Sequence, residues 1–300
     1  MHESYFRGIP WQRFNDFISP GADRFTILKE LLEEAELDYT AIDIAGNRHF
    51  FVTPLPLSGY LNQTAGHQPP VMLVAHYDRA EGSPGANDNS AGVFLLFETA
   101  LNLKKVRIEN WGVIFTDKEE LKSGEGIQTQ GSYTLALGLK DLRIENPRIF
   151  SFDACGTGDT LIISTTVEHL LKKEGSGEKL LKALLELRQF ALNKARDLGM
   201  AKVLLAPTPF SDDAGFFRAG LAAQTVTILP SSECTQLVSE LRKNSSLAET
   251  LISAELRQKI NVKSIPETWR SLNTPSDSYL RLTPEIFRTV VRFAEALCGG

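Results

Sequence analysis

Cysteine and histidine are both scarce in this chain. Its 300 residues include three cysteines, an odd number with no CxxC spacing, at Cys155, Cys234 and Cys298. A scaffold stapled by disulfides and a zinc ribbon are therefore both disfavoured. Only five histidines are available as metal ligands: His2, His49, His67, His76 and His169.

Long apolar runs and an excess of positive charge are also missing. No segment approaches the roughly 20 apolar residues of a membrane helix, and the N-terminal stretch MHESYFRGIPWQRF lacks the apolar core of a signal peptide. The formal net charge is −5, with the basic residues dispersed, which argues against nucleic-acid binding. We therefore expect no nucleic-acid or membrane partner and a cytoplasmic location.

The sequence has the composition of an ordinary globular protein, with 42% apolar and 23% charged residues. Its length is compatible with about two domains or with one large α/β domain. Short apolar runs alternate with segments of helical periodicity, a pattern typical of an α/β fold. The predicted strands are 71–75, 111–116, 148–152, 160–164, 202–205 and 224–229, and the predicted helices are 24–37, 89–104, 177–198 and 284–297. Residues 54–70 and 121–132 are expected to be loops, and 230–265 to be polar and helix-like.

Acidic residues and one histidine follow the predicted strands. In open α/β sheets, ligands bind beyond the carboxyl ends of the strands, so these positions are candidate site residues. They are His76-Tyr77-Asp78 after 71–75, Asp117 to Glu120 after 111–116, Asp153 after 148–152, and Ser211-Asp212-Asp213 after 202–205. A glycine-bounded turn, Gly85 to Gly92, contains Asp88 and opens the next helix.

A group of carboxylates at one sheet edge needs a counterion. Buried carboxylates repel one another, and a divalent cation resolves that conflict. A mixed set of histidine and carboxylates suits zinc, with manganese or another divalent metal as the alternative. Two metals about 3.5–4 Å apart would share a bridging carboxylate and hold a hydrolytic water.

Plainer interpretations exist for each residue. Asp88 would serve as a helix cap, Glu119-Glu120 as a solvated acidic turn, and Asp212 as the cap of a short helix at 213–219. Cys155 is interpreted as a small buried hydrophobe rather than a nucleophile. HExxH, GxSxG and P-loop motifs are all absent. The shared position of the acidic residues at strand ends favours the metal-site interpretation.

Taken in order, these motifs resemble the M28 family of zinc-dependent aminopeptidases. They are His76-Tyr-Asp78, then Gly-Ala-Asn-Asp88-Asn-Ser-Ala-Gly, Glu119-Glu120, Asp153, Ser211-Asp212, and a closing Asn273-Thr-Pro-Ser-Asp277. Each motif is short, but their order and spacing are specific. The similarity extends from about His76 to the C-terminal helix. It implies a single domain over residues 1–300, a three-layer sandwich whose mixed, mostly parallel sheet has helices on both faces.

The resemblance also implies a role for each position. His76 and Asp153 would hold one metal, Asp88 would bridge two metals, and Glu120 would hold the second. Glu119 would be the general base that takes a proton from the metal-bound water. Asp78 would orient His76 through its other ring nitrogen, while Asp212 and Asp277 would support the ligands without binding metal.

The chain departs from the family pattern at three places. Asn273 stands where a histidine normally binds the second metal, and an amide oxygen is a poor replacement for imidazole on zinc. Asp213 replaces the histidine that normally follows the Ser-Asp pair. The turn after Glu119-Glu120 is longer than in the family pattern, so that Gly131-Ser132 lies further along the chain than the pattern predicts. The first metal site is thus complete. The second depends on Asp88 and Glu120, with Asn273 as a weak third ligand. One of His49, His67 or His169 could replace the missing histidine if the fold brings it close.

The sequence therefore predicts a metal-dependent exopeptidase, aminopeptidase-like, acting on a peptide or aminoacyl substrate with one or two zinc ions. Two alternatives follow from Asn273. One is an inactive relative that binds a peptide or small ligand in the cleft. The other is a one-metal amidase or a cyclising acyltransferase similar to glutaminyl cyclases.

Overall fold

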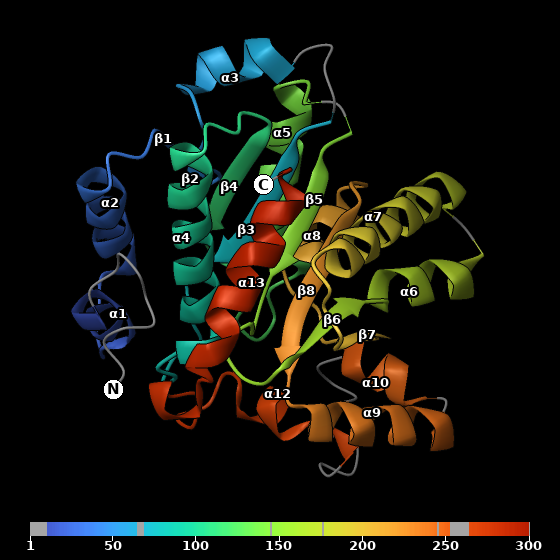
Figure 1. The fold of residues 1–300 in the computed structure, drawn as a ribbon. Coiled ribbons are helices and arrows are strands. Elements are labelled where there is room, and N and C mark those ends of the chain that lie inside the picture. Colours follow the sequence, from blue (N-terminus) through green and yellow to red (C-terminus); the bar gives the residue numbers. More distant parts are fainter. Residues whose placement is uncertain are drawn as a thin grey trace.

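Eight strands form one mixed sheet through the centre of the molecule (Figure 1). The computed structural model describes residues 11–64, 69–144, 146–175, 177–244, 246–252 and 264–299. The strand order is β1-β2-β4-β3-β5-β8-β6-β7. The strands are β1 (Tyr39–Ile44), β2 (Asn47–Val52), β3 (Val71–His76), β4 (Trp111–Thr116), β5 (Arg148–Phe152), β6 (Thr160–Ser164), β7 (Val203–Ala206) and β8 (Ala223–Leu229).

The strand directions divide the sheet into a parallel centre and reversed flanks. Strands β4, β3, β5 and β8 are parallel neighbours. On one side, β2 pairs antiparallel with β4 and β1 with β2. On the other side, β6 pairs antiparallel with β8, and β7 runs parallel to β6. The predicted α/β fold with a mixed, mostly parallel sheet is confirmed.

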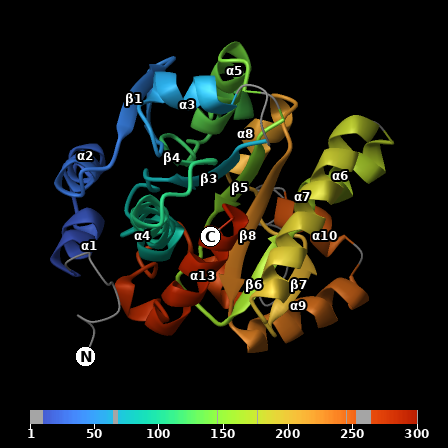
Figure 2. The same ribbon diagram turned by 45° about the horizontal axis from the view of Figure 1, so that its top comes forward.

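Helices cover both faces of the sheet, which gives three layers (Figure 2). The first face carries α4 (Ala91–Lys105), α7 (Glu178–Asp197) and α13 (Pro284–Leu297), with α1 (Trp11–Ile18) and α2 (Arg24–Glu34) beside α4 and α6 (Thr166–Glu174) beside α7. The second face carries α3 (Leu57–Thr64), α5 (Gly131–Asp141) and α8 (Asp212–Arg218), and near β6 also α9 (Ser231–Lys243), α10 (Leu247–Ile252) and α12 (Glu267–Ser271). Short helical turns are η1 (Ala86–Ser90), η2 (Ile127–Thr129) and η4 (Tyr279–Arg281). None of the described helices is long and apolar enough to cross a membrane.

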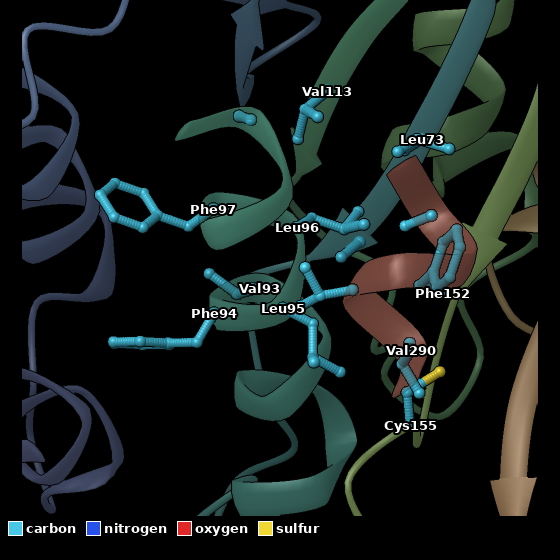
Figure 3. Close-up of a cluster of buried hydrophobic side chains, with 14 of the residues drawn as sticks. Leu73, Val93, Phe94, Leu95, Leu96, Phe97, Val113, Phe152, Cys155 and Val290 are labelled. Carbon is cyan, nitrogen blue, oxygen red and sulfur yellow. The ribbon is translucent and has the colours of Figure 1, made fainter. Parts of the chain in front are cut away.

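Side-chain alternation along the strands builds one core on each face. On β3, Leu73 and Ala75 join the core of the first face, while Met72 and Val74 join that of the second. Helix α4 is buried almost all round because it lies between the sheet and α1 and α2. Figure 3 shows Phe94 and Phe97 pointing toward the N-terminal helices, with Leu95 and Leu96 pointing the other way. The ring of Phe94 packs edge-on against two aromatic rings of α1, with centroids 5.1 and 5.5 Å away.

Several local predictions needed correction. The stretch 54–70 is not only loop, because α3 forms within it and places Tyr60 in the core. The β1–β2 hairpin was not anticipated. Residues 121–132 are largely loop, as predicted, but α5 already begins at Gly131. Within 230–265, helices α9 and α10 form, and residues 253–263 lie outside the described part of the chain.

Candidate metal centre

The candidate site lies beyond the carboxyl ends of the central strands, on the second face. His76 is the last residue of β3 and shares its face with Met72 and Val74. Thr116 is the last residue of β4 and lies on the same face of the sheet as His76. Asp153 follows β5 and lies on this face too, which it shares with Ile149. The strand ends therefore deliver these side chains to one place under α8.

Three potential metal ligands converge there. His76 Nε2 is 3.1 Å from Asp88 Oδ1 and 3.8 Å from Asp153 Oδ1. One ligand atom from each residue lies within 4.8 Å of those of the other two, and among the described residues this is the only such group of three or more. His76 is completely buried. His49 and His169 do not belong to this group, and His67 lies outside the described residues.

Asp78 connects His76 to the Glu119–Glu120 turn. Its Oδ1 lies 3.3 Å from His76 Nδ1. The same carboxylate accepts hydrogen bonds from the backbone N–H groups of Glu119 and Glu120, at 3.1 and 3.0 Å. Asp78 thus contacts the His76 imidazole and binds the backbone of both glutamates, while its predicted role in orienting the imidazole stays a prediction.

The turn that carries Asp88 is held from two sides. Asp277 accepts hydrogen bonds from the backbone N–H groups of Asn87 and Asp88, at 2.8 and 3.0 Å. The side chain of Asn89 donates to the carbonyl oxygen of Phe152 at 2.8 Å, and the Asp88–Asn89 peptide bond is cis. The closing motif of the sequence thus supports Asp88 through Asp277.

Arg24, the first residue of α2, supports the same turn and was not anticipated from the sequence. Its guanidinium is buried and donates to the carbonyl oxygens of Tyr77, Asp78 and Pro84, at 3.0, 3.0 and 2.8 Å. It also donates to Ser90 Oγ at 2.9 Å. One cation therefore ties the chain after β3 to the turn that carries Asp88. An arginine among helical residues gives no signal of such a role in the sequence.

Glu119, Glu120 and Asn273 line a pocket of about 500 Å³ together with Asp88 and Asp153. The backbone of Asn273 is left-handed, with φ 60°, a conformation that asparagine tolerates better than most residues. The remaining wall is largely apolar and is formed by Leu121, Ile127, Pro209, Phe210, Trp269 and Leu272, among others.

The carboxylates strongly perturb one another. Burial, together with Asp88, raises the pKa of Glu120 to about 9. Burial also raises the pKa of Glu119 well above its ordinary value, with the charges of Glu120 and Asp153 acting in the same direction. Burial alone would lower the pKa of His76, but the neighbouring carboxylates outweigh it and raise that pKa well above its usual range. Without a cation, these carboxyl groups therefore favour their protonated forms over shared negative charge.

Asp212 reaches the site by a route that differs from the prediction. Since β7 runs parallel to β6 and β6 antiparallel to β8, the carboxyl end of β7 points away from the site. The chain returns through residues 208–210, which line the pocket, and Asp212 opens α8. Asp212 Oδ2 then accepts a hydrogen bond from Thr116 Oγ1 at 2.8 Å. Asp213 is buried and accepts from the backbone N–H of Ser211 at 3.0 Å.

The residues present fit a divalent cation. Glu120 Oε1 is buried and has no hydrogen-bond partner among the described residues, and His76 Nε2 and Asp153 Oδ1 are buried and meet only other candidate ligands, without hydrogen-bond geometry. Buried polar atoms are normally paired, and these three lie at the wall of one pocket or against it. One imidazole with several carboxylates is a donor set that zinc accepts.

Comparison with known families agrees with this geometry. Residues 58–280 match the model of peptidase family M28. The chain belongs to peptidase family M28. No curated protein sequence matches this M28 chain.

Solved structures share the fold at low sequence identity. A zinc aminopeptidase from Bacillus subtilis is 19% identical with a TM-score of 0.51, over 83% of this chain and 49% of its own, so the M28 chain spans about half of that protein. A Zn-dependent exopeptidase from Parabacteroides distasonis is 13% identical with a TM-score of 0.61, over 99% and 97% of the two chains. A glutaminyl cyclase from Porphyromonas gingivalis is 15% identical with a TM-score of 0.60, over 100% and 98%.

Proposed function

We propose that this M28 protein is a metal-dependent exopeptidase of the aminopeptidase type. The observation that carries the proposal is that the wall of one pocket combines Asp88 and Asp153 of the candidate metal centre with the paired glutamates. Membership of a peptidase family and the zinc aminopeptidase fold support a hydrolase that uses a divalent metal.

Each candidate ligand has a distinct role in the proposal. His76 and Asp153 would hold one cation, Asp88 would contribute to this site and to a second one, and Glu120 with Asn273 would complete the second. Zinc is the favoured metal, with manganese as an alternative. When bound, the cation supplies Lewis acidity, which polarises the scissile carbonyl and makes water more acidic.

Glu119 is the proposed general base. It takes a proton from the attacking water and delivers it to the nitrogen of the leaving amine. A general base works best when its pKa lies near the operating pH, and burial raises the pKa of Glu119 from its ordinary acidic value. Its backbone N–H donates to Asp78, which fixes the backbone from which the side chain reaches the pocket wall.

Carboxylates supply the charged side chains of the pocket wall. Asp88, Glu119, Glu120 and Asp153 all line the pocket, and the described lining residues include no lysine or arginine. Cations held by Asp88, Glu120 and Asp153 would neutralise the charge of these ligands, so the preference for a free N-terminus is tested with N-acetylated substrates.

Hydrolysis of aminoacyl chromogenic substrates tests this function. We expect turnover by zinc-loaded protein, loss of turnover with a chelator, and no cleavage of N-acetylated substrates. Glu119→Gln should lower kcat by roughly 10³-fold, because general-base catalysis is removed, while metal content measured by mass spectrometry stays unchanged. Glu125→Gln is the matched control, since Glu125 lies on the following loop and pairs with Lys118 at 3.2 Å. Full activity in Glu119→Gln would rule out the assigned mechanism.

Asn273 favours a second candidate, a one-metal acyltransferase that cyclises N-terminal glutamine. In that reaction the α-amine attacks the side-chain amide carbon and ammonia leaves. The glutaminyl cyclase of Porphyromonas gingivalis matches the M28 chain over almost the whole of both. Glutaminyl peptides assayed in parallel separate the two: ammonia release without peptide cleavage identifies the cyclase. Tight peptide binding with neither reaction would identify an inactive relative.

A further inference from the structure

We propose that Gln130 is a positioning residue that anchors the carboxylate of Glu119 in the catalytic pocket. This inference rests on the proposed function for the role of Glu119 as a base, but the contact itself is tested separately below. Gln130 lies at the end of the lengthened turn, immediately before Gly131-Ser132, and lines the same pocket as Glu119.

One amide group makes two contacts to the same glutamate. Gln130 Nε2 lies 3.2 Å from Glu119 Oε1 and 3.4 Å from the Glu119 carbonyl oxygen. Donation to both atoms ties the side chain of Glu119 to its own backbone, which restricts its rotamers. A carboxylate held through one oxygen leaves the other to interact with water.

The orientation of the Gln130 amide is decided by chemistry. The carbonyl oxygen of Glu119 accepts hydrogen bonds and never donates, so the Gln130 atom that faces it must be the NH₂ group. The reversed amide would place its oxygen against two acceptors. On the other side, Ser132 Oγ donates to Gln130 Oε1 at 2.9 Å, and because a hydroxyl can donate or accept, the Glu119 carbonyl oxygen alone decides the orientation.

The backbone around Gln130 is closely packed. Gln130 is 2% exposed and Ser132 fully buried. The backbone N–H of Gly131 donates to the carbonyl oxygen of Lys118 at 3.0 Å, which closes the lengthened turn directly beside Glu119. A Cβ atom at Gly131 would lie 1.8 Å from the carbonyl oxygen of Asp117, so only glycine permits this approach.

Helix α8 supports the arrangement from the opposite side. A Cβ atom at Gly215 would lie 2.3 Å from Ser132 Oγ and 2.8 Å from Gln130 Oε1. The α8 backbone is therefore in close contact with the Ser132–Gln130 pair and leaves it little room to move. A donor held in this way fixes the base at low entropic cost during turnover.

Side-chain amide NMR tests the contact without requiring activity. In zinc-loaded protein labelled with ¹⁵N-glutamine, the Gln130 signals are assigned by their loss in Gln130→Met. We expect both amide protons to exchange slowly and to shift in Glu119→Gln, because a charge-assisted hydrogen bond becomes a neutral one. Glu125→Gln should leave them unchanged. Rapid exchange like that of the exposed Gln128, with no shift in Glu119→Gln, would overturn the proposal.

Kinetics test the consequence for catalysis. Gln130→Met keeps the side-chain length and removes the donor, so kcat should fall by roughly 10–100-fold with KM and metal content little changed. In the Glu119→Gln background, Gln130→Met should cause no further fall in kcat, since the effects of substituting residues that act through one group are not additive. Gln128→Met, on the exposed part of the same turn, is the matched control. Ser132→Ala should cause a smaller loss, and it provides a second test if Gln130→Met folds poorly.

The NMR and kinetic experiments distinguish failure of the proposed function from failure of the positioning proposal. If the wild type hydrolyses nothing, the proposed function fails, and the NMR result alone decides whether Gln130 anchors Glu119. If the wild type is active and Gln130→Met lowers kcat equally in both backgrounds, Gln130 has a merely structural role and the positioning proposal is wrong.

Discussion

At the residue scale, the centre depends on how buried carboxylates are neutralised. Asp78 and Asp277 accept hydrogen bonds from backbone N–H groups through both oxygens. Asp212 accepts one from a threonine hydroxyl through Oδ2, while Asp212 Oδ1, Asp153 Oδ1 and Glu120 Oε1 have no partner among the described residues. Asp78 and Asp277 therefore support the scaffold, and the unpaired oxygens of Asp153 and Glu120, which line the pocket, are suited to a cation.

Asp213, which is not itself a proposed ligand, gives a pH prediction in which burial is the main cause and the charges of Asp153 and Asp212 act in the same direction. Burial raises its pKa to about 7, well above the ordinary value of an aspartate, so the folded state retains a proton that the unfolded chain loses. The stability contributed by this group is complete below about pH 4 and falls as pH rises from there through about 7. An asparagine side chain at this position would mimic the protonated form and still accept the hydrogen bond from Ser211. The stability advantage of Asp213→Asn over wild type should grow by roughly 1–3 kcal/mol between about pH 5 and about pH 8.

Urea unfolding of zinc-loaded wild type and Asp213→Asn at the two pH values measures this difference. Comparing the two proteins cancels the titration of groups that do not interact with position 213. A difference that is the same at both pH values would show that Asp213 is ionised in the folded state.

The sequence predicted the residues at strand ends because their position follows from a short apolar run and the rule for parallel sheets. His76, Asp153 and the Glu119–Glu120 pair are of this kind, and the structure brings them to one place, although their roles as ligands and base stay predictions. Gln130 and Arg24 were missed because they act across loops, through contacts that no local pattern encodes.

At the scale of elements, the turn between β3 and α4 positions Asp88. Gly92, in the first turn of α4, makes this possible because a Cβ atom there would lie 2.2 Å from Asn89 Oδ1 and 2.8 Å from the carbonyl oxygen of Phe152. The same Asn89 side chain donates to that carbonyl oxygen. The close approach of α4 to the end of β5 thus requires glycine.

Gly92→Ala should therefore displace Asn89 and disturb the turn that carries Asp88. We expect a loss of about 1–3 kcal/mol in the free energy of unfolding, as for other overpacked positions, together with weaker zinc binding. The control is Gly59→Ala in α3, where the nearest atom to a new Cβ is Leu55 Cβ at 3.8 Å. That change should be neutral or stabilise by up to ~1 kcal/mol. Equal stabilities for the two variants, measured by urea unfolding, would show that α4 shifts to accommodate a methyl group.

Helical and apolar periodicity predicted most of the central elements but not their direction. Nothing in residues 160–164 distinguishes a strand antiparallel to β8 from a parallel one, because side chains alternate identically in both. This is why the predicted path of the chain from β7 to Asp212 was wrong. Helix α3 was not predicted because a glycine and several prolines in and around it indicate a loop. The β1–β2 hairpin was not predicted because β2 is buried on both faces, so its apolar and polar residues do not alternate regularly.

At the scale of the whole molecule, residues from β3 to the chain before α13 contribute to one site. Asp277, far along the chain from Asp88, holds the backbone of its turn, and Asn273 lines the same pocket. The family match over residues 58–280 covers this region. The prediction that residues 1–300 form a single domain is consistent with one continuous sheet but remains a prediction.

The central claim is that a divalent cation binds between His76, Asp88 and Asp153. Anomalous diffraction from zinc-grown crystals, recorded above and below the zinc edge, tests it most directly. We expect one strong peak within coordination distance of His76 Nε2, Asp88 Oδ1 and Asp153 Oδ1. A second peak beside Glu120 should be weak or absent in the wild type and stronger in Asn273→His, because imidazole is a better zinc ligand than an amide and histidine tolerates the left-handed backbone. A structure in which His76 contacts only its neighbouring carboxylates, with no anomalous peak at saturating zinc, would contradict the claim.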